Sequence, residues 1–220
     1  MTAGTGLSPR ELVLASYAVG ALPPALHALV GAHLALSAAN RPFVTALEEA
    51  LGRNVTQEAP CAIRAREARL DAIFACRAEP SGRAPAEACE PKALLHFLGK
   101  PVEAFEFKPV LPGIDECHLA TGDETEAKLM RVRAGFTIPH HAHDGFEVTL
   151  VLRGGMRDAT GHFRRGDLAI ASEQLDHAPV VDDDEDCLCF VVLDAPLRFP
   201  ETLNRWASVP ALLGTRPPRA

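Results

Sequence analysis

The sequence predicts an α+β protein with an N-terminal bundle of about four helices and a small C-terminal β-barrel. Three observations predict it. Apolar residues in the first third recur at spacings of three and four behind helix-start signals. A segment rich in proline, alanine and small polar residues follows, and from residue 94 onward short β-type runs alternate with turn glycines. We therefore divide the chain into a helical domain (1–78), a linker (79–92), a barrel domain (93–199) and a C-terminal tail (200–220).

The helical part has recognisable helix starts. Ser8-Pro9-Arg10-Glu11 has the form of a capping box with proline at the first helical position, and its helix is expected to end at Gly20. Further helices are expected from Pro23-Pro24, from Pro42, and over about 62–76. In the last of these, four apolar residues are expected to face a core: Ile63, Leu70, Ile73 and Phe74.

The second half is read as strands. Eight runs are β-type: 105–110, 117–121, 128–133, 146–153, 162–164, 167–171, 178–181 and 187–193. Glycines at 135, 154–155 and 166 mark turns between them. Many short strands joined by glycine turns are typical of a sandwich or barrel.

Composition excludes several classes of function. The chain has 220 residues and a formal net charge of −7, whereas proteins that bind nucleic acid directly usually carry a basic face. No apolar run approaches the roughly 20 residues that cross a bilayer, and no signal peptide is recognisable, so we expect a cytoplasmic protein. The six scattered cysteines are then expected to be free thiols rather than disulfides.

Three of the four potential metal ligands lie between Gly135 and Gly154. His141 and His143 lie two apart, so they project from the same face of a strand, and Glu147 can return to that face four residues later. His177 offers a fourth ligand downstream. Imidazole and carboxylate ligands suit Zn, Fe, Mn, Ni or Cu, so we predict one metal ion at these four residues. His140 alternates to the opposite face, and two further histidines are expected to be surface residues: His118 and His162.

The spacing Gly-x5-His-x-His-x3-Glu-x6-Gly resembles the first motif of the cupin superfamily. Gly166, His177 and Pro179 resemble the second motif, although its usual Pro-x-Gly turn is absent. The resemblance implies a double-stranded β-helix barrel with one divalent metal per chain at the predicted ligands. Zinc is the first choice, with Fe, Mn or Ni as alternatives.

Residues 11–22 and 28–40 are similar to the N-terminal domain of the ChrR-type anti-sigma factors, and the similarity extends over nearly the whole chain. It implies a transcriptional regulator that binds and inhibits an extracytoplasmic-function-type sigma factor. The cupin domain would sense oxidative stress, either singlet oxygen or peroxide. The protein is then not an enzyme and binds neither nucleic acid nor membrane. The alternative is a metal-dependent cupin enzyme, such as a small-molecule dioxygenase.

One departure from that family concerns its zinc motif, His-x3-Cys-x2-Cys. The corresponding residues here are His33, Ser37 and Asn40, which do not supply the thiolates that zinc needs. We therefore expect no zinc in the N-terminal domain and interpret His33 as a packed helix residue.

Cys187 and Cys189 alternate onto one face of a predicted strand. Two interpretations are open. They are small apolar side chains of the barrel interior, since free cysteine is often buried, or they are a redox-sensitive pair near the metal.

Overall fold

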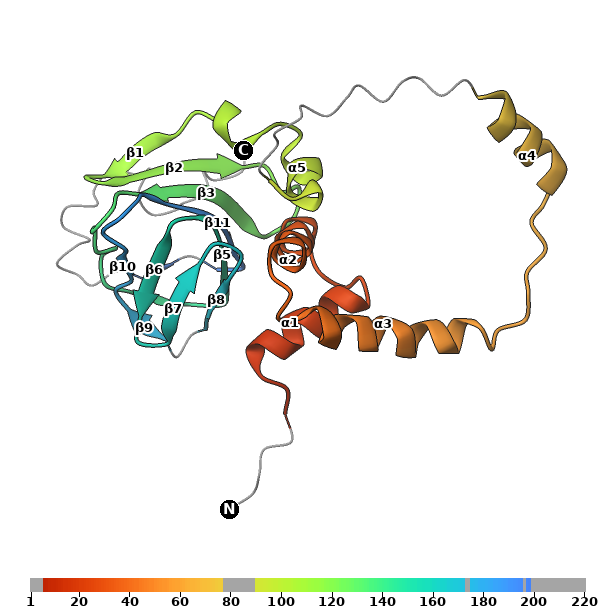
Figure 1. Cartoon of the computed structure of the whole chain (residues 1–220), viewed down its shortest axis with the longest axis horizontal. Helices are drawn as coiled ribbons and strands as arrows, with labels where there is room; N and C mark the ends of the chain where they lie inside the picture. The colour runs from red at the N-terminus through yellow and green to blue at the C-terminus, as the bar shows by residue number, and fades with distance from the viewer. Residues whose placement is uncertain (1–5, 77–89, 173–174, 196, 199–220) are drawn as a thin grey trace, which may run out of the picture.

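The computed structural model describes residues 6–76, 90–172, 175–195 and 197–198, and its first part is helical (Figure 1). The helices are α1 (Pro9–Ala18), α2 (Pro24–Leu36), α3 (Arg41–Val55), α4 (Arg66–Ala75), α5 (Lys92–Leu98) and the 3-10 turn η1 (Val102–Ala104). The predicted capping box is present, because Ser8 Oγ accepts from the backbone N–H of Glu11 and the Glu11 carboxylate accepts from that of Ser8. The four N-terminal helices confirm the prediction. Most of the predicted linker and all of the predicted tail lie outside the described residues.

The remainder is a barrel of short strands. Its strands are β1 (Lys108–Leu111), β2 (Ile114–Leu119), β3 (Glu126–Val132), β4 (His141–His143), β5 (Glu147–Arg153), β6 (Gly155–Asp158), β7 (Gly161–Arg164), β8 (Leu168–Ala171), β9 (Asp176–His177), β10 (Val180–Val181), β11 (Cys187–Leu193) and β12 (Leu197–Arg198). Every predicted β-type run overlaps a strand, with ends shifted by up to three residues. Sequence reasoning missed β6, β9 and β12, which are short and carry polar residues.

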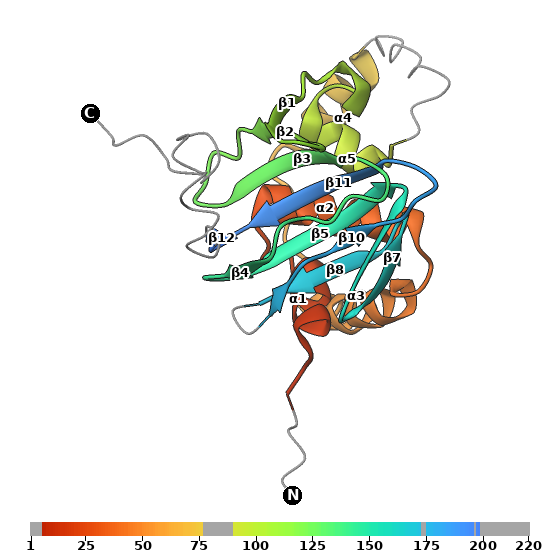
Figure 2. The same cartoon turned by 90° about the vertical axis from the view of Figure 1, so that its left-hand side faces the viewer.

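The strands form one large sheet and two small ones that face it. The large sheet has the order β1-β2-β3-β11-β5-β8, and the small sheets have the orders β10-β6-β7 and β12-β4-β9. All the pairings between named strands are antiparallel. Figure 2 shows β3, β11, β5 and β8 side by side, with α2 behind them. The fold is therefore α+β, as predicted.

Strand β11 lies between β3 and β5 in the large sheet, and all seven of its residues are buried. Its side chains alternate between two apolar clusters, because successive residues of a strand point to opposite faces. Cys189 and Val191 belong to the cluster inside the barrel. Phe190 belongs to a cluster on the outer face, which it shares with Leu29 of α2 and Leu94 of α5. Helix α2 thus packs directly on the barrel.

Helix α4 differs from its prediction. Ile63, Ile73 and Phe74 were expected to face a core, but they are 59%, 65% and 81% exposed. Figure 1 shows why: α4 lies apart from the other helices and from the barrel. The prediction was wrong because an apolar helical stripe indicates that something covers it, without indicating whether the cover belongs to the same chain. Within the described ranges, no helix has the length and apolar character needed to cross a membrane.

Candidate metal centre

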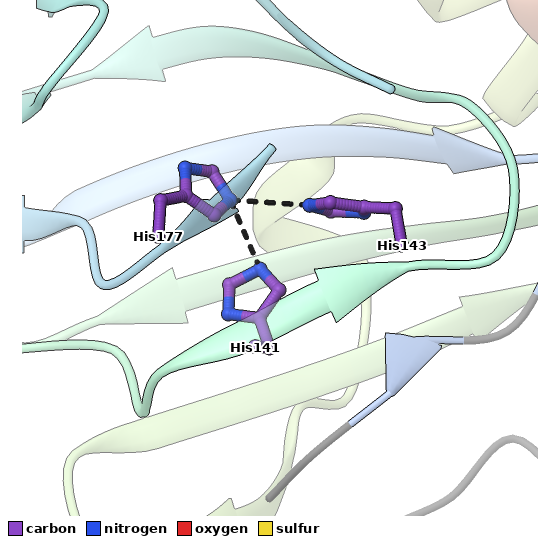
Figure 3. A group of neighbouring side chains, drawn as sticks. All are labelled: His141, His143 and His177. Atoms are coloured by element: carbon purple, nitrogen blue, oxygen red, sulfur yellow. Dashed lines mark hydrogen bonds between the residues drawn. The ribbon is translucent and has the colours of Figure 1, made fainter. Parts of the chain in front are cut away.

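Three of the four predicted ligands converge inside the barrel (Figure 3). His141 and His143 lie on β4, and His141 pairs directly with His177 of β9 across the small sheet. The Nε2 atom of His177 lies 3.2 Å from Nε2 of His141 and 3.2 Å from Nε2 of His143. All three side chains are buried. The period-two alternation of a strand therefore placed the first two histidines correctly.

The hydrogen bonds on the outer side of two of these rings fix their tautomers. Nδ1–H of His141 donates to the carbonyl of Pro139 at 2.8 Å, and Nδ1–H of His177 donates to the carboxylate of Asp158 at 2.7 Å. Each neutral ring then carries its lone pair on Nε2. Two lone pairs thus face each other at 3.2 Å, an arrangement that a shared cation would stabilise.

Burial keeps the rings in the form that binds metal. It lowers the pKa of His141 and of His143 below the ordinary histidine value, because the charged imidazolium loses hydration. Both rings are therefore neutral at neutral pH. Three imidazole side chains converging in a buried pocket are a donor set for Zn, Fe, Ni or Cu. The three histidines could hold a metal ion.

Glu147 does not join the converging group. It begins β5 in the large sheet, whereas the histidines lie in a small sheet. Its Oε2 is 3.9 Å from Nδ1 of His143, and its Oε1 accepts from Thr149 Oγ1 at 3.0 Å. The side chain does face the interior, as its even spacing predicted, and it lines the same cavity as His141 and His177. Its role as a fourth ligand stays a prediction.

Sequence reasoning missed Asp158, the last residue of β6. Its Oδ2 accepts from His177, and its Oδ1 accepts from the backbone N–H and the hydroxyl of Thr160 at 2.7 and 2.6 Å. Burial alone would raise its pKa, but the hydrogen bonds from Thr160 and His177 outweigh burial and lower it. A carboxylate in this position orients a metal-binding histidine and increases its basicity. The Asp-x-Thr-Gly turn at 158–161 was the available signal.

His141 and His177 line a cavity of about 100 Å³ whose wall is partly charged. Nζ of the buried Lys128 lies 2.8 Å from Oε1 of Glu116. His118 lies between Glu116 and Glu126 at 3.3 Å from each, and hydrogen bonding to these carboxylates raises its pKa to about 9. His118 was expected to be a plain surface residue; the structure shows that it is an ion-paired one.

Three other predicted features have separate places. His140 lies outside the cluster and pairs with Asp176 at 3.1 Å, as the alternation of the strand predicted. His162 is exposed and pairs with Asp182 at 2.7 Å. Cys187 and Cys189 are fully buried inside the barrel, with their sulfur atoms 3.5 Å apart. Their mutual hydrogen bond and their burial raise the pKa of Cys189.

The residues of the N-terminal zinc motif do not fit zinc. Nδ1 of His33 contacts the carbonyl of Gly166 at 2.6 Å, and Nε2 contacts the side-chain amide of Asn40 at 2.9 Å. Ser37 caps the C-terminal end of α2. Both ring nitrogens of His33 are engaged, and neither neighbouring position supplies a thiolate. His33 is buried, which confirms its interpretation as a packed helix residue.

Comparison with known proteins identifies the family. Residues 99–196 match the ChrR cupin-like domain. Over 193 residues the chain is 35% identical to the anti-sigma-E factor ChrR of Cereibacter sphaeroides, a match that covers 86% of this chain and 90% of that protein. The chain belongs to the ChrR family of anti-sigma factors. The ChrR relationship identifies a regulator rather than an enzyme.

Solved structures agree with this family. The crystal structure of Rhodobacter sphaeroides SigE in complex with the anti-sigma ChrR matches with a TM-score of 0.68 and 32% identity, over 86% of this chain and 97% of that chain. An acetylacetone dioxygenase from Acinetobacter johnsonii matches with a TM-score of only 0.37 and 17% identity, over 42% of this chain and 70% of that chain. A similarity that low supplies no argument for the dioxygenase alternative.

Proposed function

We propose that this protein is an anti-sigma factor that binds and inhibits an extracytoplasmic-function-type sigma factor through its helical domain (1–78). The barrel domain (93–199) would bind a metal and sense oxidative stress, with residues 79–92 as linker and 200–220 as tail. The observation that carries the proposal is the match to ChrR, a protein whose solved structure is a complex with SigE. We place the protein in the cytoplasm, where a sigma factor acts.

The exposed apolar face of α4 supports a protein partner. Ile73 and Phe74 lie on this helix, and Val55 at the end of α3 is 71% exposed. Large exposed apolar side chains on elements without cover from their own chain are typical of interaction sites. Because α4 lies apart from the other helices and the barrel (Figure 1), its apolar face is accessible to a protein partner.

For the metal, we propose zinc held by His141, His143 and His177, with Glu147 as the fourth ligand. Movement of the Glu147 side chain away from Thr149 and toward the histidines would complete the tetrahedral set that zinc prefers. Iron, manganese and nickel also bind such ligands. The signal would be singlet oxygen or a peroxide, and two thiols are candidate targets: Cys187 and Cys189. Their burial and the raised pKa of Cys189 slow oxidation, so an oxidant would have to enter the barrel.

Sigma-factor binding is tested by mixing the purified chain with extracytoplasmic-function-type sigma factors from the source cell and measuring complex formation by calorimetry. Repression of sigma-dependent transcription in vitro is the second readout. Phe74→Asp should weaken binding at least about tenfold, because a buried aromatic at an interface contributes about 2 kcal/mol or more. Arg153→Asp, an exposed change on the barrel, is the matched control. If no sigma factor binds, the proposal is wrong. If both variants bind a sigma factor equally well, α4 is not part of the binding surface.

A further inference from the structure

The end of α2 contacts the barrel at the turn between β7 and β8, residues 165–167. His33 lies in the last turn of α2 and is 2% exposed. One nitrogen of its ring reaches the carbonyl of Gly166 in that turn, and the other reaches Asn40 before α3. A single side chain therefore connects α2, the start of α3 and the barrel.

The partners of the ring determine its protons. A backbone carbonyl only accepts, so Nδ1 of His33 must carry a hydrogen and donate it to Gly166. In the neutral ring Nε2 is then an acceptor, and the amide of Asn40 donates to it. Asn40 is the N-cap residue of α3, yet its side chain makes no capping hydrogen bond. Its amide group binds His33 instead, although asparagine is among the preferred N-cap residues.

Two other contacts lie at the same place. The guanidinium of Arg10 on α1 donates to the carbonyl of Leu168 at 3.1 Å. Gly166 has φ +92, and a Cβ there would lie 3.0 Å from Cβ of Leu36. Glycine thus permits both the backbone of the turn and the close approach of α2. The helices and the barrel meet through hydrogen bonds and close packing at one turn.

We propose that His33, between Asn40 and Gly166, is a metal-free clamp that holds the helical bundle on the barrel. His33 occupies the histidine position of the family's zinc motif, but here its imidazole makes two hydrogen bonds. Through them it joins α2, the start of α3 and the β7–β8 turn. Opening the β7–β8 turn and releasing α2 are then one event, since neither can move without breaking the hydrogen bonds of His33. The clamp requires no sigma factor, so it stands independently of the proposed function.

Hydrogen exchange of the free, full-length protein tests the clamp. His33→Ala should speed exchange at least about tenfold both in α2 and at residues 161–168, since a buried histidine with two hydrogen bonds is lost. The matched control is His96→Ala, an exposed histidine on α5, which should leave both segments unchanged. Faster exchange in α2 alone, or in neither segment, would overturn the proposal.

Two further measurements cover other outcomes. If His33→Ala does not fold, Arg10→Ala decides, because Arg10 is exposed and its guanidinium binds Leu168, the residue that follows the turn. It should speed exchange at residues 165–171 about two- to fivefold, and unchanged exchange there would count against the clamp. Metal content per chain should be equal in the wild type and in His33→Ala. A loss of one equivalent would identify His33 as a metal ligand and overturn the inference.

Discussion

Replacing Asp158 with asparagine should weaken metal binding without changing the ligands themselves. The two carboxylate oxygens of Asp158 have different partners, because one accepts from His177 and the other from Thr160. An asparagine side chain has one acceptor oxygen and one donor amide. It can therefore serve His177 or Thr160, but it cannot accept from both.

The expected loss has two parts. Removing a carboxylate that holds a metal-binding histidine typically lowers metal affinity about 10- to 100-fold, which corresponds to about 1.4–2.7 kcal/mol. In the metal-free protein, leaving one buried donor without an acceptor should lower the free energy of unfolding by about 1–3 kcal/mol. The two parts are measured separately because the second does not require metal.

Metal affinity is measured by competition with a chromophoric chelator, and stability by denaturant unfolding of the metal-free protein. Asp182→Asn is the matched control, since Asp182 also accepts from a histidine, His162, at 2.7 Å, but that histidine lies outside the metal cluster. The control should keep wild-type affinity. If Asp158→Asn binds metal within about twofold of the wild type, far less than the loss expected for such a carboxylate, then Asp158 does not hold His177 for the metal and the reasoning fails.

Three further predictions concern the fold. The pKa of His118 is raised to about 9 in the folded protein. The stability that its ion pairs contribute is therefore complete below its unfolded pKa near 6.5 and is lost as pH rises through 9. His118→Gln should remove about 1 kcal/mol of this pH-dependent stability, after screening by solvent, and equal pH profiles of unfolding for the two proteins would contradict this. Phe190→Ala should lower the free energy of unfolding by about 3–5 kcal/mol because the ring is fully buried between the sheet and the helices; a loss under about 1 kcal/mol would show that the outer cluster is loosely packed. Gly154→Ala should destabilise the protein by at least about 1–3 kcal/mol, since φ is +69 and the new Cβ would lie 2.7 Å from the carbonyl oxygen of Asp186, and an unchanged melting temperature would refute the strain.

The parts of the fold that could be predicted from sequence are those set by residues only a few positions apart in the chain. His141 and His143 share a face because strands alternate every residue, and Ser8 starts α1 through a partner only three residues away. Asp158 could not be found in this way, because its contact with His177 crosses between strands of different small sheets. The exposure of Phe74 could not be predicted from sequence either. An amphipathic pattern is the same whether the covering surface belongs to the chain or to a partner.

Glu147 shows the limit of a local rule. Its spacing predicted the interior face correctly, yet Gly145 and the end of β4 place it on another sheet. The distance between its carboxylate and the histidines therefore depends on how two sheets close on each other, which no local pattern encodes. The ligand assignment of Glu147 came from its even spacing to the histidines, with the cupin motif in agreement, and it stays a prediction. The structure brings together the three histidines.

The outer apolar face of the large sheet has a practical consequence for anyone who divides this protein. Ala25, Leu29 and Ala32 of α2 complete the cluster around Phe190 and Leu150. A barrel fragment that begins after residue 89 would lack α2. It would expose the side chains of Phe190 and Leu150 and their sheet neighbours to water as a contiguous apolar surface. Such a fragment should self-associate or precipitate, whereas the intact chain keeps the surface covered. Helix α2 and the large sheet share this apolar cluster, so the two predicted domains are best produced together.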